Sequence, residues 1–258
     1  MKTITLKVIS FISLFLLFTS LISSKPLCFT SNKNESIITI DSTSSVGLPM
    51  RLRDIPTLNI SGSAQFTKDQ LLNLKNSINK DNICIVDLRQ ESHGMINDLA
   101  ISFLNPYKDL NNGFTTEQTI KAENSLLNKI KIGNTIQLYK HTGIFIKDIT
   151  VDFISNESQL VTEADMQYKR FAVKDNSAPT PDIVDEFVEF IKNKPDDIHL
   201  HFHCAAGKGR TTSFMVMYQA MKNNSNLTLE QLLSYQYNIG GVNLHDNKTA
   251  IPHRPIED

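Results

Sequence analysis

The most constraining feature of this sequence is a strand that runs through a glycine-containing turn into an apolar helix. Ile198 to His203 alternate apolar and histidine side chains, as a strand does, and Thr211 to Met221 are apolar on almost every face, as a central helix is. The turn between them carries Gly207 and Gly209, which can take backbone conformations closed to other residues. A strand followed at once by a buried helix is typical of parallel α/β folds.

The rest of the chain alternates helical and strand-like segments. Capping-box sequences, in which Thr precedes Gln at the third helical position, predict three helix starts. These starts are Thr67, Thr115 and Thr228. Thr180-Pro181 predicts a fourth helix, and the apolar run Ile83 to Leu88 predicts a buried parallel strand. We therefore predict an α/β fold with a central, mostly parallel sheet flanked by helices, and a small β-rich lobe at about residues 134–165.

Composition and charge exclude several classes of protein. The 258-residue chain has 40% hydrophobic and 21% charged residues, which is ordinary for a globular domain. With 26 Lys and Arg against 27 Asp and Glu, the net charge of -1 provides no general field to hold nucleic acid. The three cysteines, Cys28, Cys84 and Cys204, do not form an even disulfide framework. Any anion site must therefore be built locally.

Residues 1–24 have the form of a secretory signal peptide. Lys2 and Lys7 precede an apolar run from Val8 to Ile22, and two small serines follow. The run is shorter than the ~20 residues of a spanning helix, and an uncleaved anchor is the second interpretation. We expect a secreted or extracytoplasmic protein with no stable membrane span after signal removal. Residues 25–47 would then form a polar leader, 48–245 the folded domain and 246–258 a polar tail.

The turn after residue 203 combines a cysteine with the features of an anion site. Cys204 stands at the strand end and Arg210 at the helix start. Unpaired N–H groups and positive partial charge at a helix N-terminus attract phosphate and favour the thiolate form of a nearby cysteine. Arg210 offers a planar fork for two phosphoryl oxygens. The backbone amides expected to bind phosphate belong to Ala205, Ala206, Gly207, Lys208 and Gly209.

Three further residues are expected to assist this chemistry. Thr211 can donate its hydroxyl to the sulfur, and His203 can steady the turn through its ring. A nucleophile that captures a phosphoryl group also needs a proton donor for the departing oxygen. Asp175 is our candidate, because it lies in a loop between a strand and a capped helix. A solvated loop aspartate without a role is the alternative.

The segment Cys204 to Arg210 resembles the signature loop of the cysteine-dependent protein tyrosine phosphatase superfamily. Three longer stretches are similar to one branch of it, the protein tyrosine phosphatase-like inositol polyphosphate phosphatases, often called cysteine phytases. These stretches are Leu58 to Gln65, Val86 to Gly94 and His201 to Met217. The resemblance covers about residues 48–245.

This resemblance implies a protein tyrosine phosphatase-like fold with a small β-barrel lobe, and hydrolysis of inositol polyphosphates without a metal or cofactor. It implies that Cys204 is the nucleophile, Arg210 the phosphate binder and Asp175 the general acid. Relatives often have His after the acid, whereas this sequence has Asn176. Relatives also continue into a further helix, which is either replaced or missing here because the sequence ends at Asp258.

Additional cations are expected around the phosphate site. Lys208 adds a point charge suited to a substrate with several phosphates rather than to a single phosphotyrosine. Further candidates for the rim are Arg53, Arg89, His93 and Lys140. For the two arginines and the lysine the alternative is a structural ion pair or a solvated charge, and for His93 it is a structural hydrogen bond.

The three histidines His199, His201 and His203 share one face of their strand and raise the question of a metal site. No Cys-x-x-Cys motif or carboxylate pair accompanies them, so we do not expect one. The sequence thus predicts a secreted cysteine-dependent phosphatase that hydrolyses inositol polyphosphates such as phytate through a phosphocysteine. Two alternatives stay open: a phosphatase of protein phosphotyrosine, of dual specificity or of phosphoinositide lipids, and a phosphate-binding protein without turnover.

Overall fold

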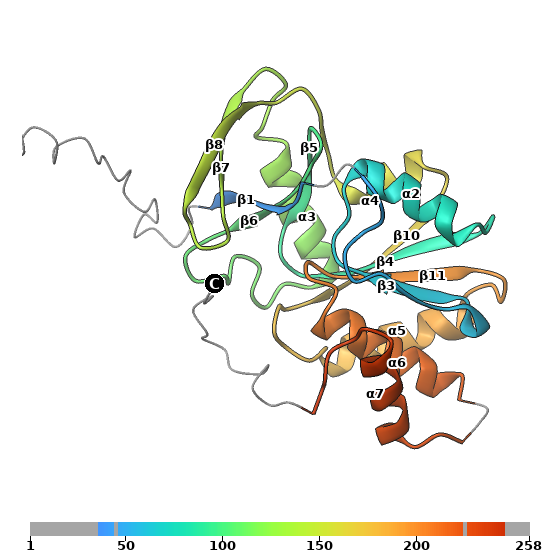
Figure 1. The fold of residues 1–258 in the computed structure, drawn as a ribbon. Helices are drawn as coiled ribbons and strands as arrows, with labels where there is room; N and C mark the ends of the chain where they lie inside the picture. The colour runs from blue at the N-terminus through green and yellow to red at the C-terminus, as the bar shows by residue number, and fades with distance from the viewer. Residues whose placement is uncertain (1–35, 44–45, 224–225, 246–258) are drawn as a thin grey trace, which may run out of the picture.

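The computed structural model describes residues 36–43, 46–223 and 226–245 (Figure 1). The expected signal peptide, part of the expected leader and the expected C-terminal tail lie outside the described residues. Two β-sheets and six α-helices form the described part of the chain. No helix in this part is long and apolar enough to span a membrane.

The central sheet has five strands in the order β10-β4-β11-β3-β2 and is parallel except at its β2 edge, as the sequence predicts. Its strands are β2 (Arg53–Ile55), β3 (Ile60–Ser63), β4 (Ile83–Arg89), β10 (Gln167–Val173) and β11 (His199–His203). Parallel strands end at the same edge of a sheet, and this edge is where α/β proteins bind ligands. The segments that follow β4, β10 and β11 therefore lie close together.

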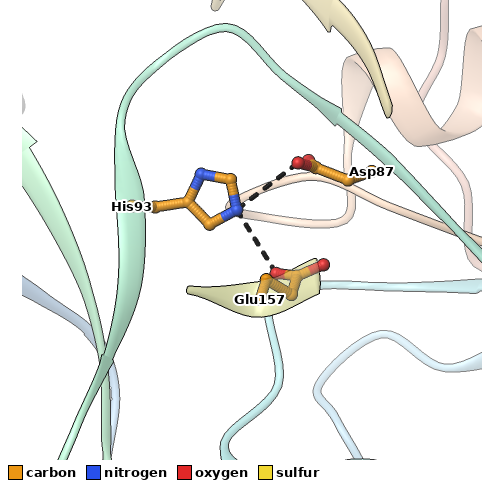
Figure 2. Close-up of side chains that lie close together, drawn as sticks. All are labelled: Asp87, His93 and Glu157. Atoms are coloured by element: carbon orange, nitrogen blue, oxygen red, sulfur yellow. Dashed lines mark ion pairs between the residues drawn. The ribbon is translucent and has the colours of Figure 1, made fainter. Parts of the chain in front are cut away.

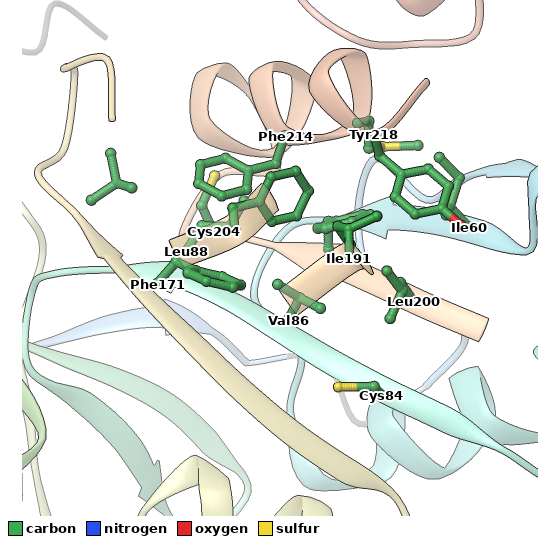
Figure 3. Packing of buried hydrophobic residues seen from close by; sticks show 14 of the residues in the cluster. Ile60, Cys84, Val86, Leu88, Phe171, Ile191, Leu200, Cys204, Phe214 and Tyr218 are labelled. Carbon is green, nitrogen blue, oxygen red and sulfur yellow. The ribbon is translucent and has the colours of Figure 1, made fainter. Parts of the chain in front are cut away.

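Helices cover both faces of the central sheet because its strands are apolar on both sides. On one face, α5 (Pro181–Asn193) and α6 (Gly209–Met221) pack on an apolar cluster that includes Val86, Phe171 and Phe202 (Figure 3). α7 (Leu229–Asn238) packs against α6. On the other face, α2 (Lys68–Ile78) and α4 (Glu157–Glu163) lie over a second apolar cluster.

The helices begin where the capping residues predict. The side chains of Thr67, Thr115 and Thr228 each accept a hydrogen bond from the third helical N–H, and the side-chain oxygen of the Gln at that position accepts one from the threonine N–H. α5 begins at Pro181, although the Thr180 side chain makes no capping hydrogen bond. α4 was not predicted; the Asn156 side chain caps it.

A second, open sheet forms the β-rich lobe, with strands in the order β8-β7-β1-β6-β5-β9. Its strands are β1 (Ile37–Ser42), β5 (His93–Ile96), β6 (Leu99–Leu104), β7 (Thr135–Tyr139), β8 (Phe145–Thr150) and β9 (Ile154–Ser155). The edge strands β8 and β9 do not pair with each other, so the described strands form no closed barrel, contrary to what the resemblance implied. Strands outside 134–165 belong to this sheet because β1 bridges β6 and β7. α3 (Thr116–Leu127) packs Leu127 into its core.

Candidate active site

The segment from Cys204 to Arg210, called the phosphate loop below, joins β11 to α6 at the carboxyl edge of the central sheet. Gly207 has a φ of +66°. A Cβ built on Gly207 would lie 2.4 Å from the Ala64 amide nitrogen, so only glycine allows this close approach. On the same side of the loop, the Gln65 amide donates to the Ala205 carbonyl at 3.1 Å. The loop is thus held against the end of β3.

Cys204 lies at the border between the apolar cluster and the polar loop. Its side chain is buried beside Phe214 and Leu88 (Figure 3). Its sulfur nevertheless has polar contacts, because the Thr211 hydroxyl donates to Sγ at 3.2 Å, as the sequence predicts. The sulfur is therefore not sealed within apolar packing.

Arg210 and Asp175 meet in the structure although 34 residues lie between them in the sequence. The Arg210 Nη2 lies 3.0 Å from the Asp175 Oδ1. Asp175 lies after β10, and its side chain is 59% exposed. The next residue, Asn176, has a φ of +55° and donates to the Asp175 Oδ2. The loop after β10 therefore brings a solvent-accessible carboxylate to the guanidinium of the phosphate loop.

Glu91 is the principal site residue that the sequence analysis missed. Its two carboxylate oxygens accept hydrogen bonds from Arg210 at 2.6 and 2.8 Å, and Oε1 also accepts one from Arg89 at 2.9 Å. Burial opposes ionisation of Glu91, but the charges of Arg210 and Arg89 hold its pKa well below the usual range. Burial would likewise lower the pKa of Arg210, yet Glu91 and Cys204 raise it above its ordinary value. Glu91 thus fixes the Arg210 fork.

Arg89 continues this chain of ion pairs into the β-rich lobe and does not lie on a rim. It is fully buried, and its Nη1 lies 2.9 Å from the Asp41 carboxylate of β1. Burial opposes ionisation of Asp41, but Arg89 and His141 lower its pKa to about 2. The buried position of Arg89 follows from these carboxylate partners, which compensate its charge. The β-rich lobe thereby helps to hold the phosphate loop.

His93 is also buried rather than at a rim. Its Nε2 lies 3.4 Å from the Asp87 carboxylate and 3.3 Å from that of Glu157, as Figure 2 shows. Its Nδ1 lies 3.1 Å from the Glu123 carboxylate. Burial and the Arg89 charge oppose protonation, yet Glu123 and Asp87 raise the pKa of His93 to about 10. His93 is therefore an imidazolium that joins three carboxylates.

The cluster of Asp87, His93 and Glu157 is the one group within the described ranges that has the spacing of metal ligands. Its chemistry does not fit a cation, because a protonated imidazole has no free lone pair. Asp87 also contacts the Arg170 guanidinium at 3.0 Å, and Glu157 lies 2.7 Å from the His203 Nε2. Both carboxylates therefore already have side-chain partners among the described residues.

The histidines of β11 are held by neighbouring side chains. The Ser61 hydroxyl lies 2.8 Å from both His199 Nε2 and His201 Nδ1, and the Ser63 hydroxyl lies 2.9 Å from His201 Nε2. Burial lowers the pKa of His199 to about 4 and that of His201 well below its usual range. His203 instead pairs with Glu157 and packs on the Phe66 ring. Ser61 thus joins the His199 and His201 rings, and His203 has a different partner, so among the described residues the three rings do not form a group with the spacing of metal ligands.

The remaining predicted residues lie in two environments. Ala206, Lys208 and Gly209 are exposed on the phosphate loop, and Ala205 is partly buried. Lys140 is exposed in the turn between β7 and β8, where its backbone N–H bonds to Ile144. The structure gives Lys140 no contact with the phosphate loop.

Arg53 is buried beside the phosphate loop and not at a rim. Its Nη1 donates to the Gly207 carbonyl at 3.0 Å, and its Nη2 donates to the Thr212 hydroxyl at 3.2 Å. This position follows from its strand, because β2 pairs with β3, which packs against the loop.

Two cavities flank the site. A small one of about 30 Å³ is lined by Glu91 and Asp175 together with Lys108 and Lys174. A larger one of about 1070 Å³ lies along α3, β10 and α5, and no residue of the phosphate loop lines it. No residue of the phosphate loop lines the smaller hollow either, but Glu91 and Asp175, which both contact Arg210, do line it, so it lies beside the site.

Comparison with known proteins finds a matching family and similar solved structures. Residues 86–222, just over half of the chain, match the protein tyrosine phosphatase-like phytase family. The description of this family is "Inositol hexakisphosphate". The solved tandemly repeated protein tyrosine phosphatase-like phytase of Mitsuokella multacida superposes with a TM-score of 0.75 at 30% identity, over 86% of this chain and 44% of that one. The phytase of Bdellovibrio bacteriovorus superposes with a TM-score of 0.71 at 29% identity, over 82% and 78% of the two chains.

A curated relative is the effector protein hopD2 of Pseudomonas syringae pv. tomato, which is 26% identical over 78% of this chain and 46% of its own length. The Mitsuokella multacida myo-inositol phosphatase solved in complex with myo-inositol-(1,3,4,5)-tetrakisphosphate has a TM-score of 0.75 at 30% identity, over 89% of this chain and 43% of that one. The chain spans less than half of the length of hopD2 and of the Mitsuokella proteins.

Proposed function

This chain belongs to the protein tyrosine phosphatase-like phytase family, and from that premise we propose that it is a secreted phosphatase that removes phosphate from inositol polyphosphates such as phytate. The observation that carries the proposal is the convergence of Cys204, Arg210 and Asp175 on one loop at the carboxyl edge of a parallel sheet. The Mitsuokella complex with an inositol tetrakisphosphate supports the substrate class.

The first proposed step transfers the phosphoryl group to sulfur. The Cys204 thiolate attacks phosphorus, the bond from phosphorus to the leaving oxygen breaks, and the protonated Asp175 gives its proton to that oxygen. Thr211 stabilises the thiolate through its hydroxyl, which donates to Sγ at 3.2 Å. Arg210 and the amides of the phosphate loop hold the other phosphoryl oxygens as their charge redistributes.

The second proposed step restores the enzyme. Water attacks the phosphorus of the phosphocysteine and gives a proton to the Asp175 carboxylate. The bond between sulfur and phosphorus breaks, which releases inorganic phosphate and regenerates the thiolate. The balance needs only water as a co-reactant.

The ion pair between Arg210 and Asp175 suggests how substrate prepares the acid. A phosphoryl oxygen bound at Arg210 Nη2 would compete with the Asp175 carboxylate, which now lies 3.0 Å from that nitrogen. Binding would then release Asp175 toward the leaving oxygen. Glu91 keeps Arg210 in place during this exchange, because it is bound at both terminal nitrogens.

Exposed cations near the loop support a substrate with several phosphates. Lys208 lies in the loop, and Lys174 and Lys108 line the small hollow next to Asp175. Separate phosphates of one inositol ring could engage these side chains simultaneously. The similarity to a protein named as an effector supports keeping one alternative, a phosphatase secreted as an effector that acts on protein phosphotyrosine or on phosphoinositide lipids.

The test compares phosphate release from inositol hexakisphosphate, a phosphotyrosine peptide and phosphoinositide vesicles. We expect the highest kcat/KM on inositol hexakisphosphate, and none on any substrate with Cys204→Ser. Faster release from the peptide would favour the effector alternative. If the wild-type enzyme binds inositol hexakisphosphate without release from any of the three, the proposal of an enzyme is wrong.

Secretion needs its own experiment, because the N-terminal residues lie outside the described ranges. We propose that the segment up to Ser24 directs export and is then removed. Expression of the full chain in a bacterial host, followed by N-terminal sequencing of the exported protein, should find a start just after Ser24. Retention of the complete chain in the membrane fraction would favour the uncleaved anchor.

A further inference from the structure

Arg53 differs from the other buried arginines near the site because no carboxylate compensates it. Arg89, Arg170 and Arg210 each lie within 3.0 Å of at least one buried or partly buried carboxylate. Among the described residues, none places a carboxylate within ion-pair distance of Arg53. Its Nε also has no hydrogen-bond partner, and the residue is 4% exposed. A buried guanidinium in this condition needs another anion nearby.

The Arg53 fork points to the phosphate loop. Its Nη1 binds the Gly207 carbonyl at 3.0 Å, and its Nη2 binds the Thr212 hydroxyl in the first turn of α6 at 3.2 Å. Both contacts leave the positive charge of the guanidinium uncompensated. Burial lowers the pKa of Arg53 to about 10, and the favourable charge acting on it comes from Cys204.

The Cys204 thiolate, in turn, needs a cation nearby. Its side chain borders an apolar cluster, which disfavours a charged sulfur. Arg210 is already bound to Glu91 and Asp175, and in the proposed reaction it also holds the phosphoryl oxygens. A second cation, not shared with carboxylates or substrate, would favour the thiolate both before it attacks phosphorus and when it leaves the phosphocysteine.

We infer that Arg53 is a positioning residue whose charge stabilises the Cys204 thiolate from the buried side of the phosphate loop. The inference rests on the proposed role of Cys204 as a thiolate nucleophile. Because Arg53 is buried, substrate does not displace it from the loop. The other charged or titratable groups around the loop are Arg210 with its two carboxylates, the exposed Lys208, and Arg51, whose charge also acts on Arg53. On the strand before the loop they are His203, which lies 2.7 Å from Glu157, and His201, whose pKa is lowered by burial and also by the Arg53 charge.

The test measures Cys204 alkylation by iodoacetamide as a function of pH, with peptide mass spectrometry to separate Cys204 from the other cysteines. This readout needs no turnover, so it can fail independently of the proposed function. In Arg53→Gln, which can still donate to Gly207, we expect the midpoint of the alkylation profile to rise by about 1 pH unit. The rate at the high-pH plateau should stay near the wild-type value, since all of the sulfur is then thiolate.

Two variants act as controls. Arg51→Gln removes a neighbouring exposed charge and should leave the midpoint unchanged. Arg53→Lys keeps the charge and loses the fork, so its midpoint should stay close to wild type. A wild-type midpoint in folded Arg53→Gln, or a lower plateau with no change in midpoint, would show that Arg53 only supports the loop structurally. If Arg53→Gln does not fold, Arg53→Met, which removes the charge and fills a similar volume with apolar atoms, decides: a midpoint raised by about 1 pH unit supports the inference, and an unchanged midpoint overturns it.

Discussion

Replacing Gly207 by Ala should destabilise and displace the phosphate loop more than the addition of one methyl group at any other position in it. The backbone at Gly207 has a φ of +66°, where an L-residue costs about 1–2 kcal/mol. The new Cβ would also meet backbone atoms of Ser63 and Ala64 at 2.4 to 2.8 Å, and backbone cannot give way as a side chain can. Strain and contact together predict a loss of about 2–3 kcal/mol in the free energy of unfolding.

This loss is measurable by thermal unfolding and by kinetics. For a chain of this size, about 2–3 kcal/mol corresponds to a Tm lower by about 4–12 °C. Relief of the contact would move the loop away from β3 and displace Arg210, and a misplacement of ~1 Å can reduce the rate by about 10²-fold. We therefore expect kcat/KM for inositol hexakisphosphate to fall by about that factor.

Gly209→Ala is the matched control for stability. Gly209 is in the same loop, but a Cβ there meets nothing within 4 Å, and its φ is not in the left-handed region. Because Gly209 is the first residue of α6, alanine should raise stability by about 0.4–1 kcal/mol. Equal Tm values for the two alanine variants, or a fully active and stable Gly207→Ala, would refute the packing argument.

Four further predictions concern the groups around the loop. Glu91→Gln leaves Arg89 and Arg210 without their shared carboxylate and should cost about 3 kcal/mol or more in urea denaturation, with a raised KM; an unchanged KM would argue against its role in fixing Arg210. Asp175→Asn should slow hydrolysis of an alkyl phosphate by about 10²–10⁴-fold and that of an aryl phosphate with a good leaving group much less, whereas equal losses would move the acid elsewhere. The pKa of His93 is raised to about 10, so its stabilising ion pairs are fully present below about pH 6.5 and are lost as pH rises toward 10. The free energy of unfolding of the wild type should therefore fall over this range. His93→Gln should not show this loss. Phosphate release should persist in excess EDTA, and inhibition that added metal reverses would contradict the thiolate route.

Local signals in the sequence predict much of the fold and the centre of the site. The capping boxes at Thr67, Thr115 and Thr228 are read from neighbouring residues, and all three form as predicted. The turn from β11 into α6 is also local, so Cys204 and Thr211 could be placed together before the structure was known.

Long-range pairings explain what the sequence does not show. Asp41 reaches Arg89 only because β1 joins the second sheet, and the sequence of this six-residue strand gives no hint of that neighbour. Glu91 is a single carboxylate in a polar turn, and its role depends on the meeting of β4 and α6 across the sheet edge. His93 and Arg53 are residue types that often lie at the rim of an anion site, but here both are buried by partners far away in the chain.

The most direct test of Cys204 as the nucleophile is a rapid-quench search for the covalent intermediate. Wild-type enzyme is mixed with an excess of substrate carrying labelled phosphate, quenched during turnover and digested. We expect label on the peptide that contains Cys204, attached to sulfur, and none on that peptide from Cys204→Ser. Label on His203 or another side chain, or full turnover by Cys204→Ser, would contradict it.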